Sequence, residues 1–359
     1  MRDIVLYGLI IIVSGVLAEL SVRFKHRLVR IYCVVNMILI PSAFAGLRTG
    51  IGTDYYNYVV IFKESQNNFW DSRIEKGYLL INRIIAMLGG DEHFMFFVIC
   101  ALTILFVYLA LYDRRDKISV GIGMFMFLLL YYQTSYNLVR HVLAISILLF
   151  SLKYVFDKKF IRFIMWVAIA TLIHSSSVFF VPVYFVNRIL EKKPYISIQA
   201  MILAMVFLFI RYMDIIFLKI FSLIPFLESY STYLAGASHF QSGGHLMLDL
   251  MNMTYIAPGF IMYFILKKLD ERFVMYYFLL LTGFVIQFAS RGLFELIAIR
   301  ASMEYFVAVV IVVPYYFKAL NQRRLVSISF LLTLIYIMIW LAIFFHFKNS
   351  ETIPYNWIL

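Results

Sequence analysis

Charged residues are scarce in this chain of 359 residues, because Asp, Glu, Lys and Arg together make up only 14% of it. A soluble domain carries about 25% charged residues, whereas 63% of this chain is hydrophobic. Cysteine is scarce as well. Cys33 and Cys100 both lie in apolar runs, so they imply neither a disulfide framework nor a metal site.

The signatures of several enzyme classes are also missing. The chain has no D-x-D for a metal-bound nucleotide sugar, no glycine-rich phosphate loop, no G-x-S-x-G and no H-E-x-x-H. His239, His245 and Asp249 share one loop, but their spacing matches no standard metal site. We therefore expect no metal and no cofactor. A reaction without nucleotides needs an activated donor, such as a sugar on a lipid-linked pyrophosphate.

Apolar runs long enough to cross a bilayer recur along the whole chain. They predict an all-α, polytopic membrane protein with a single domain over residues 1–359. The N-terminal run has no obvious cleavage site, so we interpret it as the first span rather than a signal peptide. The twelve predicted spans are roughly 4–22, 31–46, 93–112, 118–135, 138–156, 161–174, 176–190, 195–212, 253–267, 273–290, 304–318 and 325–346.

Two segments need a more specific interpretation. The apolar run 161–190 is basic at both ends, which favours two short helices bent at residues 174–177. Segment 77–88 has apolar residues at helical spacing but is short for a span. We expect it to lie in the membrane interface or to re-enter the membrane.

The net charge of +12 is carried by short basic clusters between the apolar runs. This pattern is typical of the positive-inside rule rather than of nucleic-acid binding. With twelve spans and both termini facing outward, all these clusters fall on the inner side. They are residues 23–30, 113–117, 157–162, 191–193, 267–272 and 318–324. The long outer connections are then residues 47–92, 213–252 and 289–303, followed by the tail 347–359.

Most of the ionisable groups near the apolar runs fall on this outer side. An Arg or Asp at the centre of a membrane helix costs about 2.5–3.5 kcal/mol, so several such groups together predict a shared polar cavity. Guanidinium groups match the geometry of a diphosphate, and a base must deprotonate the acceptor hydroxyl. The candidate arginines are Arg48, Arg140, Arg291 and Arg300. The candidate bases are Asp54, Glu75 and His174.

Each candidate also has a purely structural interpretation. Arg291 with Glu295, and Arg300 with Glu304, have the i,i+4 spacing of pairs that neutralise each other. A continuous helix would place these pairs about 180° apart, unless it breaks near Gly292. Arg140 has no acidic residue within one helical turn, and the alternative to a binding role is snorkelling to lipid phosphate.

The stretch 46–58, "GLRTGIGTDYYNY", combines polar and glycine residues at the end of an apolar run. Gly50 and Gly52 predict a backbone turn at the outer end of the second span. This turn would present Arg48 and Asp54 to the substrate. The neighbouring tyrosines are expected either to stack on sugar or to anchor the chain at the interface.

Several stretches in order resemble the EpsG family of Wzy-type polysaccharide polymerases. They are "LRTGIGTDYYNYVVIF", "EKGYLLINRII", "YNLVRHVLAISILLFSLKY", "TLIHSSSVFFVPVYF", "IRASMEYFVAVVIVVPYY" and "IPY". The resemblance runs from about residue 45 to the end. His141 departs from it, since many relatives have glutamine there.

The resemblance implies a glycosyltransferase C-like helical fold and polymerisation of undecaprenyl-pyrophosphate-linked repeat units on the outer face of the bacterial cytoplasmic membrane. The expected product is an exopolysaccharide, capsule or O-antigen. Expected partners are the lipid-linked oligosaccharide, membrane lipid and a chain-length regulator. We thus expect a metal-independent glycosyltransferase, in which Tyr55, Tyr58 and Tyr78 join the arginines in binding substrate. The alternatives are an O-antigen-type ligase and a lipid-linked oligosaccharide flippase, which should show a two-half repeat.

Overall fold

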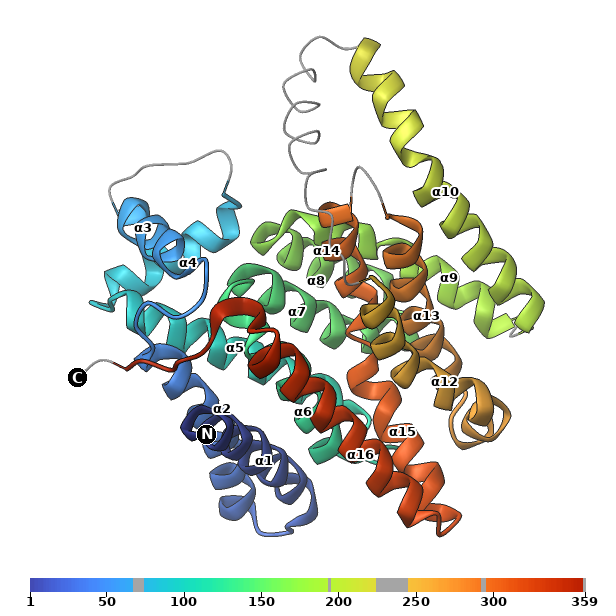
Figure 1. Ribbon diagram of the computed structural model, residues 1–359, viewed down its shortest axis with the longest axis horizontal. Helices are drawn as coiled ribbons and strands as arrows, with labels where there is room; N and C mark the ends of the chain where they lie inside the picture. The colour runs from blue at the N-terminus through green and yellow to red at the C-terminus, as the bar shows by residue number, and fades with distance from the viewer. Residues whose placement is uncertain (67–73, 193–194, 224–244, 292–294, 358–359) are drawn as a thin grey trace. The chain divides into compact units, whose positions relative to one another are not determined.

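The computed structural model describes residues 1–66, 74–192, 195–223, 245–291 and 295–357 (Figure 1). These residues form helices joined by short connections. Their only extended pairing is an isolated antiparallel bridge between Arg48 and Trp357. The predicted all-α class is confirmed for this part of the chain.

The chain forms two compact units. The first combines Met1–Val181 with Val313–Leu359, and the second is Pro182–Val312. Helices of the first unit are α1 (Arg2–Arg23), α2 (Arg27–Leu47), α3 (Tyr55–Gln66), α4 (Lys76–Met87), α5 (Glu92–Asp113), α6 (Val120–Phe127), α7 (Val139–Phe156), α8 (Phe160–Ile173) and α16 (Val326–Leu341). The second unit contains α9 (Pro182–Lys192), α10 (Ile196–Leu223), α12 (His245–Leu269), α13 (Phe273–Ala289) and α14 (Glu295–Phe306). Helix α15 (Val309–Gln322) leads from the second unit back into the first.

Six described helices are long and apolar enough to cross a membrane. They are Arg2–Arg23, Arg27–Leu47, Glu92–Asp113, Val139–Phe156, Leu246–Leu269 and Val326–His346. A seventh span results if Ile299–Phe306 and Val309–Gln322, which meet at a bend of 41°, are counted together. Shorter apolar helices cover Val120–Tyr132, Phe160–Ile173, Ile196–Tyr212 and Phe273–Ala289. The chain is therefore a multi-pass membrane protein. Six to seven of its described helices qualify as spans by length and composition, and the number of twelve stays a prediction.

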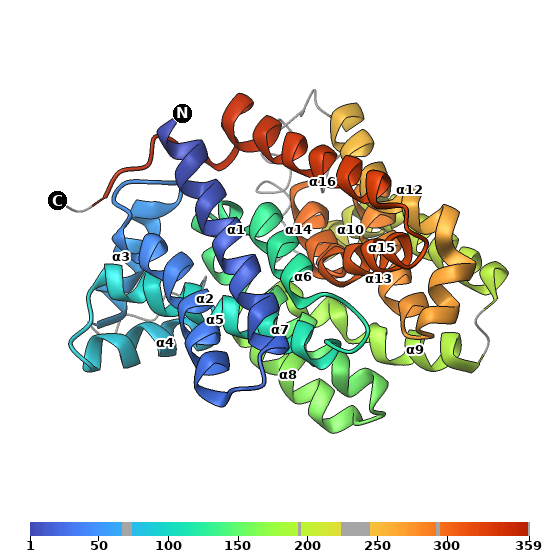
Figure 2. The ribbon, with the colours of Figure 1, turned by 90° about the horizontal axis from the view of Figure 1, so that it is seen from below.

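Neighbouring long helices build the core of the first unit. Helix α1 packs against α2 and α6, α2 against α5, α5 against α7, and α7 against α8. Helix α7 is buried along most of its length, as expected for an apolar helix with neighbours on several sides. Figure 2 shows α1 running beside α6. Helix α7 is held in place by its packing against α5 and α8.

Both chain termini lie at the same end of the first unit (Figures 1 and 2). The Arg2 guanidinium donates a hydrogen bond to the Tyr355 carbonyl over 2.7 Å. The turn at Gly50 and Gly52, whose φ angles are 63° and 94°, lies here too, because the Gly52 N–H donates to the Glu351 carbonyl over 3.2 Å. The predicted turn after α2 is confirmed.

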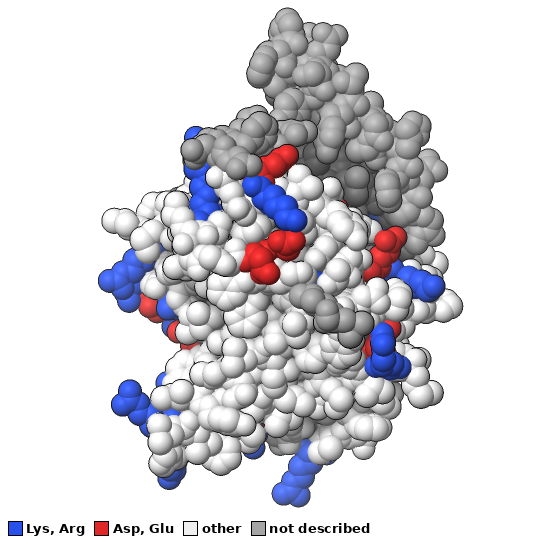
Figure 3. Space-filling view, turned by 90° about the vertical axis from the view of Figure 1, so that its left-hand side faces the viewer, with Lys and Arg blue, Asp and Glu red and all other residues white. Residues whose placement is uncertain are grey.

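The basic connections lie at the opposite end of this unit. Lys318 donates to the Asp116 carbonyl over 3.2 Å, and Arg114 donates to the Tyr315 hydroxyl over 3.1 Å. These contacts bring the clusters 113–117 and 318–324 together. Figure 3 shows basic groups alone along the lower edge of one face and mixed acidic and basic groups over its upper half. This separation of charge is the one that the positive-inside rule predicts.

Candidate active site

The Glu75 carboxylate joins three elements that are distant in the sequence. It accepts hydrogen bonds from the Arg140 guanidinium and from the backbone N–H of Ser175, over 3.0 Å. The Nδ1 atom of His174 lies 3.7 Å from the same carboxylate. Glu75 immediately precedes α4, Arg140 lies in the first turn of α7, and His174 follows α8. Three of the predicted site residues therefore lie in one cluster.

Local backbone features explain why these residues meet. Helix α8 ends at His174, whose φ of −148° and ψ of 119° are extended, and a short 3₁₀ helix, Ser175–Phe180, follows. The predicted bend at residues 174–177 is confirmed. Helix α4 approaches α8 so closely that a Cβ atom on Gly77 would lie 2.6 Å from the Leu172 carbonyl oxygen. Only glycine allows this approach, which brings Glu75 next to the end of α8.

The cluster is partly buried but remains accessible. The side chains of Arg140, Glu75 and His174 are 23%, 17% and 16% exposed. Burial raises the pKa of the Glu75 carboxyl, but the charge of Arg140 and the hydrogen bond from Ser175 outweigh it. The pKa of Glu75 therefore lies below its ordinary value. Glu75 is ionised at neutral pH and fixes a positive guanidinium at the surface of the site.

Aromatic side chains form the floor of the cluster. The Arg140 guanidinium lies 5.6 Å from the centre of the Tyr78 ring, and the rings of Tyr58 and Tyr78 meet edge to face at 6.1 Å. Tyr58 donates to the Asn137 carbonyl over 3.1 Å. Burial raises the pKa of both tyrosine hydroxyls, so both remain protonated. The predicted residues Tyr58 and Tyr78 thus form a packed aromatic surface beside the Arg140 guanidinium and help to fix its position.

His141 belongs to the same neighbourhood although it was not among the predicted site residues. Its side chain is 1% exposed, and its ring centre lies 4.4 Å from that of His174. Its position directly after Arg140 was the available signal. The buried ring restricts where the His174 imidazole can lie.

Arg48 lies apart from this cluster, in the interior. Its side chain is 1% exposed, and its guanidinium is sandwiched 4.2 Å from the Phe96 ring and 4.1 Å from the Tyr136 ring. Its Nε and Nη1 atoms are buried without a hydrogen-bond partner among the residues the structure describes. Cation–π contacts therefore replace an acidic partner here. A direct contact with substrate would require these rings to separate.

Asp54 and Tyr55 lie at the start of α3. Asp54 is partly exposed, and its carbonyl accepts the Tyr58 N–H. Tyr55 is 3% exposed and stacks on Phe96 with ring centres 5.2 Å apart. The ring of Tyr55 is therefore a core contact in this structure rather than a surface for sugar.

The C-terminal tail covers the turn between α2 and α3. The Thr49 N–H donates to the Asn356 carbonyl over 3.1 Å. Thr352 is fully buried and accepts a hydrogen bond from Gln133 over 2.8 Å. Trp340 in turn donates to the amide oxygen of Gln133 over 2.8 Å. Only the stretch "IPY" drew attention to this tail in the sequence, and its docking position was not predicted.

In the second unit, Arg291 pairs with Asp249 rather than standing alone. The pair is partly exposed, and the guanidinium lies 4.5 Å from the Phe288 ring. The side chains of Glu295 and His239 lie outside the described residues, so the i,i+4 pair of Arg291 stays a prediction. On α14, Arg300 is exposed whereas Glu304 is fully buried.

Metal ligands do not gather in the described part of the chain. No group of three or more His, Cys, Asp or Glu residues there could hold a metal ion. The donors of the Glu75 cluster are instead the Arg140 guanidinium and the His174 imidazole, since the buried hydroxyls of Tyr58 and Tyr78 donate to the Asn137 carbonyl and the Met95 sulfur. Such a set can bind a diphosphate and move a proton.

Comparison with known proteins gives one result. The profile of the EpsG family matches residues 31–357, nearly the whole chain. No curated protein sequence and no solved structure matches the chain.

Proposed function

Because the chain belongs to the EpsG family of Wzy-type polymerases, we propose that it polymerises undecaprenyl-pyrophosphate-linked oligosaccharide repeat units. Membership of the family implies a membrane-bound polysaccharide polymerase that acts on a lipid-linked saccharide. We place the reaction on the outer face of the bacterial cytoplasmic membrane. The product is an exopolysaccharide, capsule or O-antigen. A chain-length regulator remains a proposed partner to which we assign no surface.

The reaction is a glycosyl transfer between two lipid-linked chains. A hydroxyl of the acceptor attacks C1 of the reducing-end sugar of the donor. The bond between C1 and the diphosphate oxygen breaks, and the lipid diphosphate leaves with the bonding electrons. The proton of the attacking hydroxyl passes to a base. The site must therefore stabilise the charge on the leaving group and accept one proton.

The single observation that carries the proposal is the contact of Glu75 with both Arg140 and the His174 segment. Arginine has five N–H donors, so the guanidinium of Arg140 can pair with Glu75 and still donate to a diphosphate. Glu75 restricts the rotation of that guanidinium, which lowers the entropy lost on binding. We assign Arg140 to the leaving diphosphate.

We assign His174 as the base. The sequence left Asp54, Glu75 and His174 as alternatives. Glu75 is a weak base because its pKa is lowered and Arg140 and Ser175 occupy its oxygens. The same negative charge, 3.7 Å from His174 Nδ1, stabilises the imidazolium that forms when His174 takes the proton. Asp54 is kept as a less direct candidate, since it contacts the cluster through Tyr58.

The remaining candidates are proposed either to bind substrate or to position Arg140. Arg291 and Arg300, in the second unit, are proposed to bind a diphosphate, because both are accessible in part. Tyr58 and Tyr78 position Arg140. We assign Arg48 to positioning as well. It follows α2, and its guanidinium packs between the ring of Phe96 on α5 and the ring of Tyr136, just before α7.

We also propose that the chain crosses the membrane twelve times, in a glycosyltransferase C-like arrangement of helices. Both termini lie at one end of the first unit, which requires an even number of crossings. Four shorter apolar helices are available as spans in addition to the seven counted with the bent pair, and the predicted span 176–190, over the 3₁₀ helix Ser175–Phe180 and α9, is the twelfth. The basic clusters at the other end support an outward position for the Glu75 cluster.

The two alternatives differ in what they would do with the same substrate. A flippase is expected to have two consecutive repeat halves, whereas here one compact unit is inserted within the sequence of the other. A ligase would use an acceptor other than a second lipid-linked repeat unit. Polymerisation is favoured over both by the family membership.

The proposal is tested with purified protein in lipid nanodiscs and a lipid-linked repeat unit as sole donor and acceptor. We expect a ladder of polymer products, and the same ladder in excess EDTA, because no carboxylate pair or histidine cluster in the sequence has the spacing of metal ligands. Ladders that disappear with EDTA and return with Mg²⁺ would contradict the metal-independent mechanism. Transport of the substrate across a liposome membrane without a new glycosidic bond would favour the flippase.

A further inference from the structure

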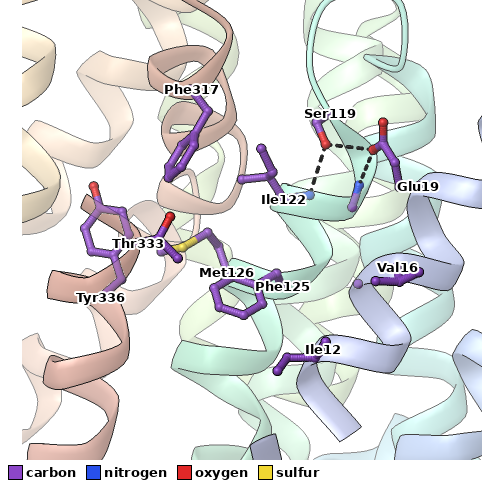
Figure 4. Close-up of a pocket in the computed structure, with 12 residues that line it drawn as sticks. Ile12, Val16, Glu19, Ser119, Ile122, Phe125, Met126, Phe317, Thr333 and Tyr336 are labelled. Atoms are coloured by element: carbon purple, nitrogen blue, oxygen red, sulfur yellow. Dashed lines mark hydrogen bonds between the residues drawn. The ribbon is translucent and has the colours of Figure 1, made fainter. Parts of the chain in front are cut away.

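Two cavities lie at the basic end of the first unit, one on each side of α1. The first has a volume of about 310 Å³ and lies between α1, α6, α15 and α16 (Figure 4). Its lining is mainly aliphatic and aromatic, and Glu19 is its one charged residue. Glu19 already accepts hydrogen bonds from Ser119, the Gly121 N–H and Arg23. This cavity therefore offers no donor to an anion.

The second cavity has a different composition. It measures about 380 Å³ and is enclosed by the end of α1, the first three turns of α2 and the last turns of α5. Arg27 and Arg30 line it at the beginning of α2. Ile31, Val34 and Val35 continue its wall along the same helix. At 1.5 Å per residue, the wall changes from cationic to apolar over roughly 12 Å.

Helix α5 supplies the facing wall. Tyr108, Leu109 and Tyr112 line the cavity, and the Tyr108 hydroxyl lies 2.9 Å from Ser21 Oγ. Arg115 stacks on the Tyr112 ring at 4.2 Å. A third guanidinium is thereby held next to the cavity mouth. Hydroxyl and guanidinium groups therefore line the cavity together with aliphatic side chains.

The charged residues that line this cavity are both basic. Its lining contains no acidic residue, and the first turn of α2 contains none. Arg27 and Arg30 are exposed. An anion with an apolar extension would match both the basic and the apolar residues of this lining.

We propose that this cavity binds one anionic phospholipid from the leaflet at the basic end of the molecule. Its phosphate is held by Arg27 and Arg30, with Arg115 at the mouth, since guanidinium groups form paired hydrogen bonds with phosphate oxygens. One acyl chain lies along Ile31, Val34 and Val35. Basic pockets between membrane helices at the cytoplasmic side are suited to anionic lipid head groups.

The site is independent of the proposed polymerase reaction, because it lies at the opposite end of the first unit from Glu75. The lipid-linked substrate that reacts at Glu75 is therefore not the ligand of this cavity. The bound lipid would instead tie the connection between α1 and α2 to the end of α5. It would stabilise the folded protein by an amount that grows with the logarithm of the lipid concentration once the site is largely occupied.

Native mass spectrometry of the delipidated protein in a neutral detergent tests the proposal. Phosphatidylglycerol and phosphatidylcholine with identical acyl chains are titrated in parallel. We expect the first phosphatidylglycerol to bind at least about tenfold more tightly than phosphatidylcholine, and to raise the melting temperature. The double variant Arg27→Gln/Arg30→Gln should lose this preference. The matched control is Arg323→Gln/Arg324→Gln, which removes two exposed arginines from another connection at the same end.

Two further measurements distinguish the source of the phosphate. Val35→Trp keeps both arginines but fills the apolar wall, so lipid binding should fall. Glycerol phosphate at millimolar concentration should not displace the lipid, because it lacks the acyl chain. Equal affinity for the two lipids, or equal losses in the control variant, would overturn the proposal. So would displacement by glycerol phosphate or full binding by the Val35→Trp variant.

Discussion

Arg140 and Glu75 form an ion pair although they lie 65 residues apart in the chain. Glu75 precedes α4 and Arg140 lies in the first turn of α7, and both of these helices pack against α8. Breaking a partly buried pair by removing one partner leaves the other charge uncompensated. The pair is therefore both a structural contact and the means by which Arg140 is oriented.

Substitution of Arg140 by lysine separates diphosphate binding from lipid snorkelling. Arg140→Lys retains the charge but loses the planar, two-pronged contact. We expect polymerisation to fall at least about tenfold, or about 1.4 kcal/mol of transition-state stabilisation, and Arg140→Ala to be worse. Polymer ladders are measured at equal amounts of folded protein.

The control for that experiment is Arg323→Lys at the basic end, which should leave the ladders unchanged. A lysine side chain can reach lipid phosphate as well as arginine does. Full activity of Arg140→Lys would therefore remove Arg140 from the active site.

The lowered pKa of Glu75 predicts a specific pH dependence of stability. A carboxyl with a depressed pKa in the folded state contributes stability above its unfolded pKa, about 4.3. That contribution is lost as the pH falls through the lower folded pKa. We expect Glu75→Gln to melt below the wild type at pH 7, with the difference shrinking progressively as the pH falls below about 4.3. A difference that stays constant with pH would show that the charge of Glu75 plays no part.

Gly77 sets the approach of α4 to α8. A Cβ atom there would lie 2.6 Å from the Leu172 carbonyl, so Gly77→Ala should push the helices apart. We expect a lower melting temperature and reduced polymerisation, since Glu75 moves away from His174. Gly8→Ala is the matched control, because the nearest atom to its Cβ is 4.0 Å away and alanine favours a helix. Equal effects of the two substitutions would contradict a role for this close approach.

The proposed topology is tested by labelling single cysteines introduced into intact cells. We expect a cysteine at Val60 to react with a membrane-impermeant reagent and a cysteine at Arg115 to be protected. Val60 lies on α3, near the cluster, and Arg115 lies in the basic connection after α5. Both positions are exposed, so the accessibility of a cysteine there reports the side of the membrane. Labelling of Arg115→Cys from outside would invert the map and the location of the reaction.

Local features of the fold could be predicted from the sequence. Apolar runs determine helices such as α1 and α5, since burial in a bilayer requires internal hydrogen bonding. The positive φ of Gly50 and Gly52 follows from the glycine residues themselves. The break at His174 followed from the basic residues at both ends of a long apolar run.

Long-range contacts could not be predicted in the same way. The sequence identified Glu75, Arg140 and His174 as candidates because each is ionisable near an apolar run. Their contact depends on which helices are neighbours, and a periodic pattern carries no such information. The burial of Arg48 between Phe96 and Tyr136 could not be predicted for the same reason. An arginine next to a glycine-rich turn resembles an exposed ligand until the aromatic rings are placed around it.

The most direct test of the mechanism is the rate at which a His174→Gln variant releases polyprenyl diphosphate from a lipid-linked repeat unit. Glutamine preserves polarity and approximate size but cannot act as a general base at neutral pH. The control is His26→Gln, which changes an exposed histidine at the basic end. Only variants that melt at the wild-type temperature are compared, and all proteins are assayed at equal concentration. We predict that His174→Gln loses at least about 100-fold in rate while His26→Gln retains the wild-type rate. Release at the wild-type rate by folded His174→Gln would contradict the assignment of His174 as the base and the location of the reaction at the Glu75 cluster.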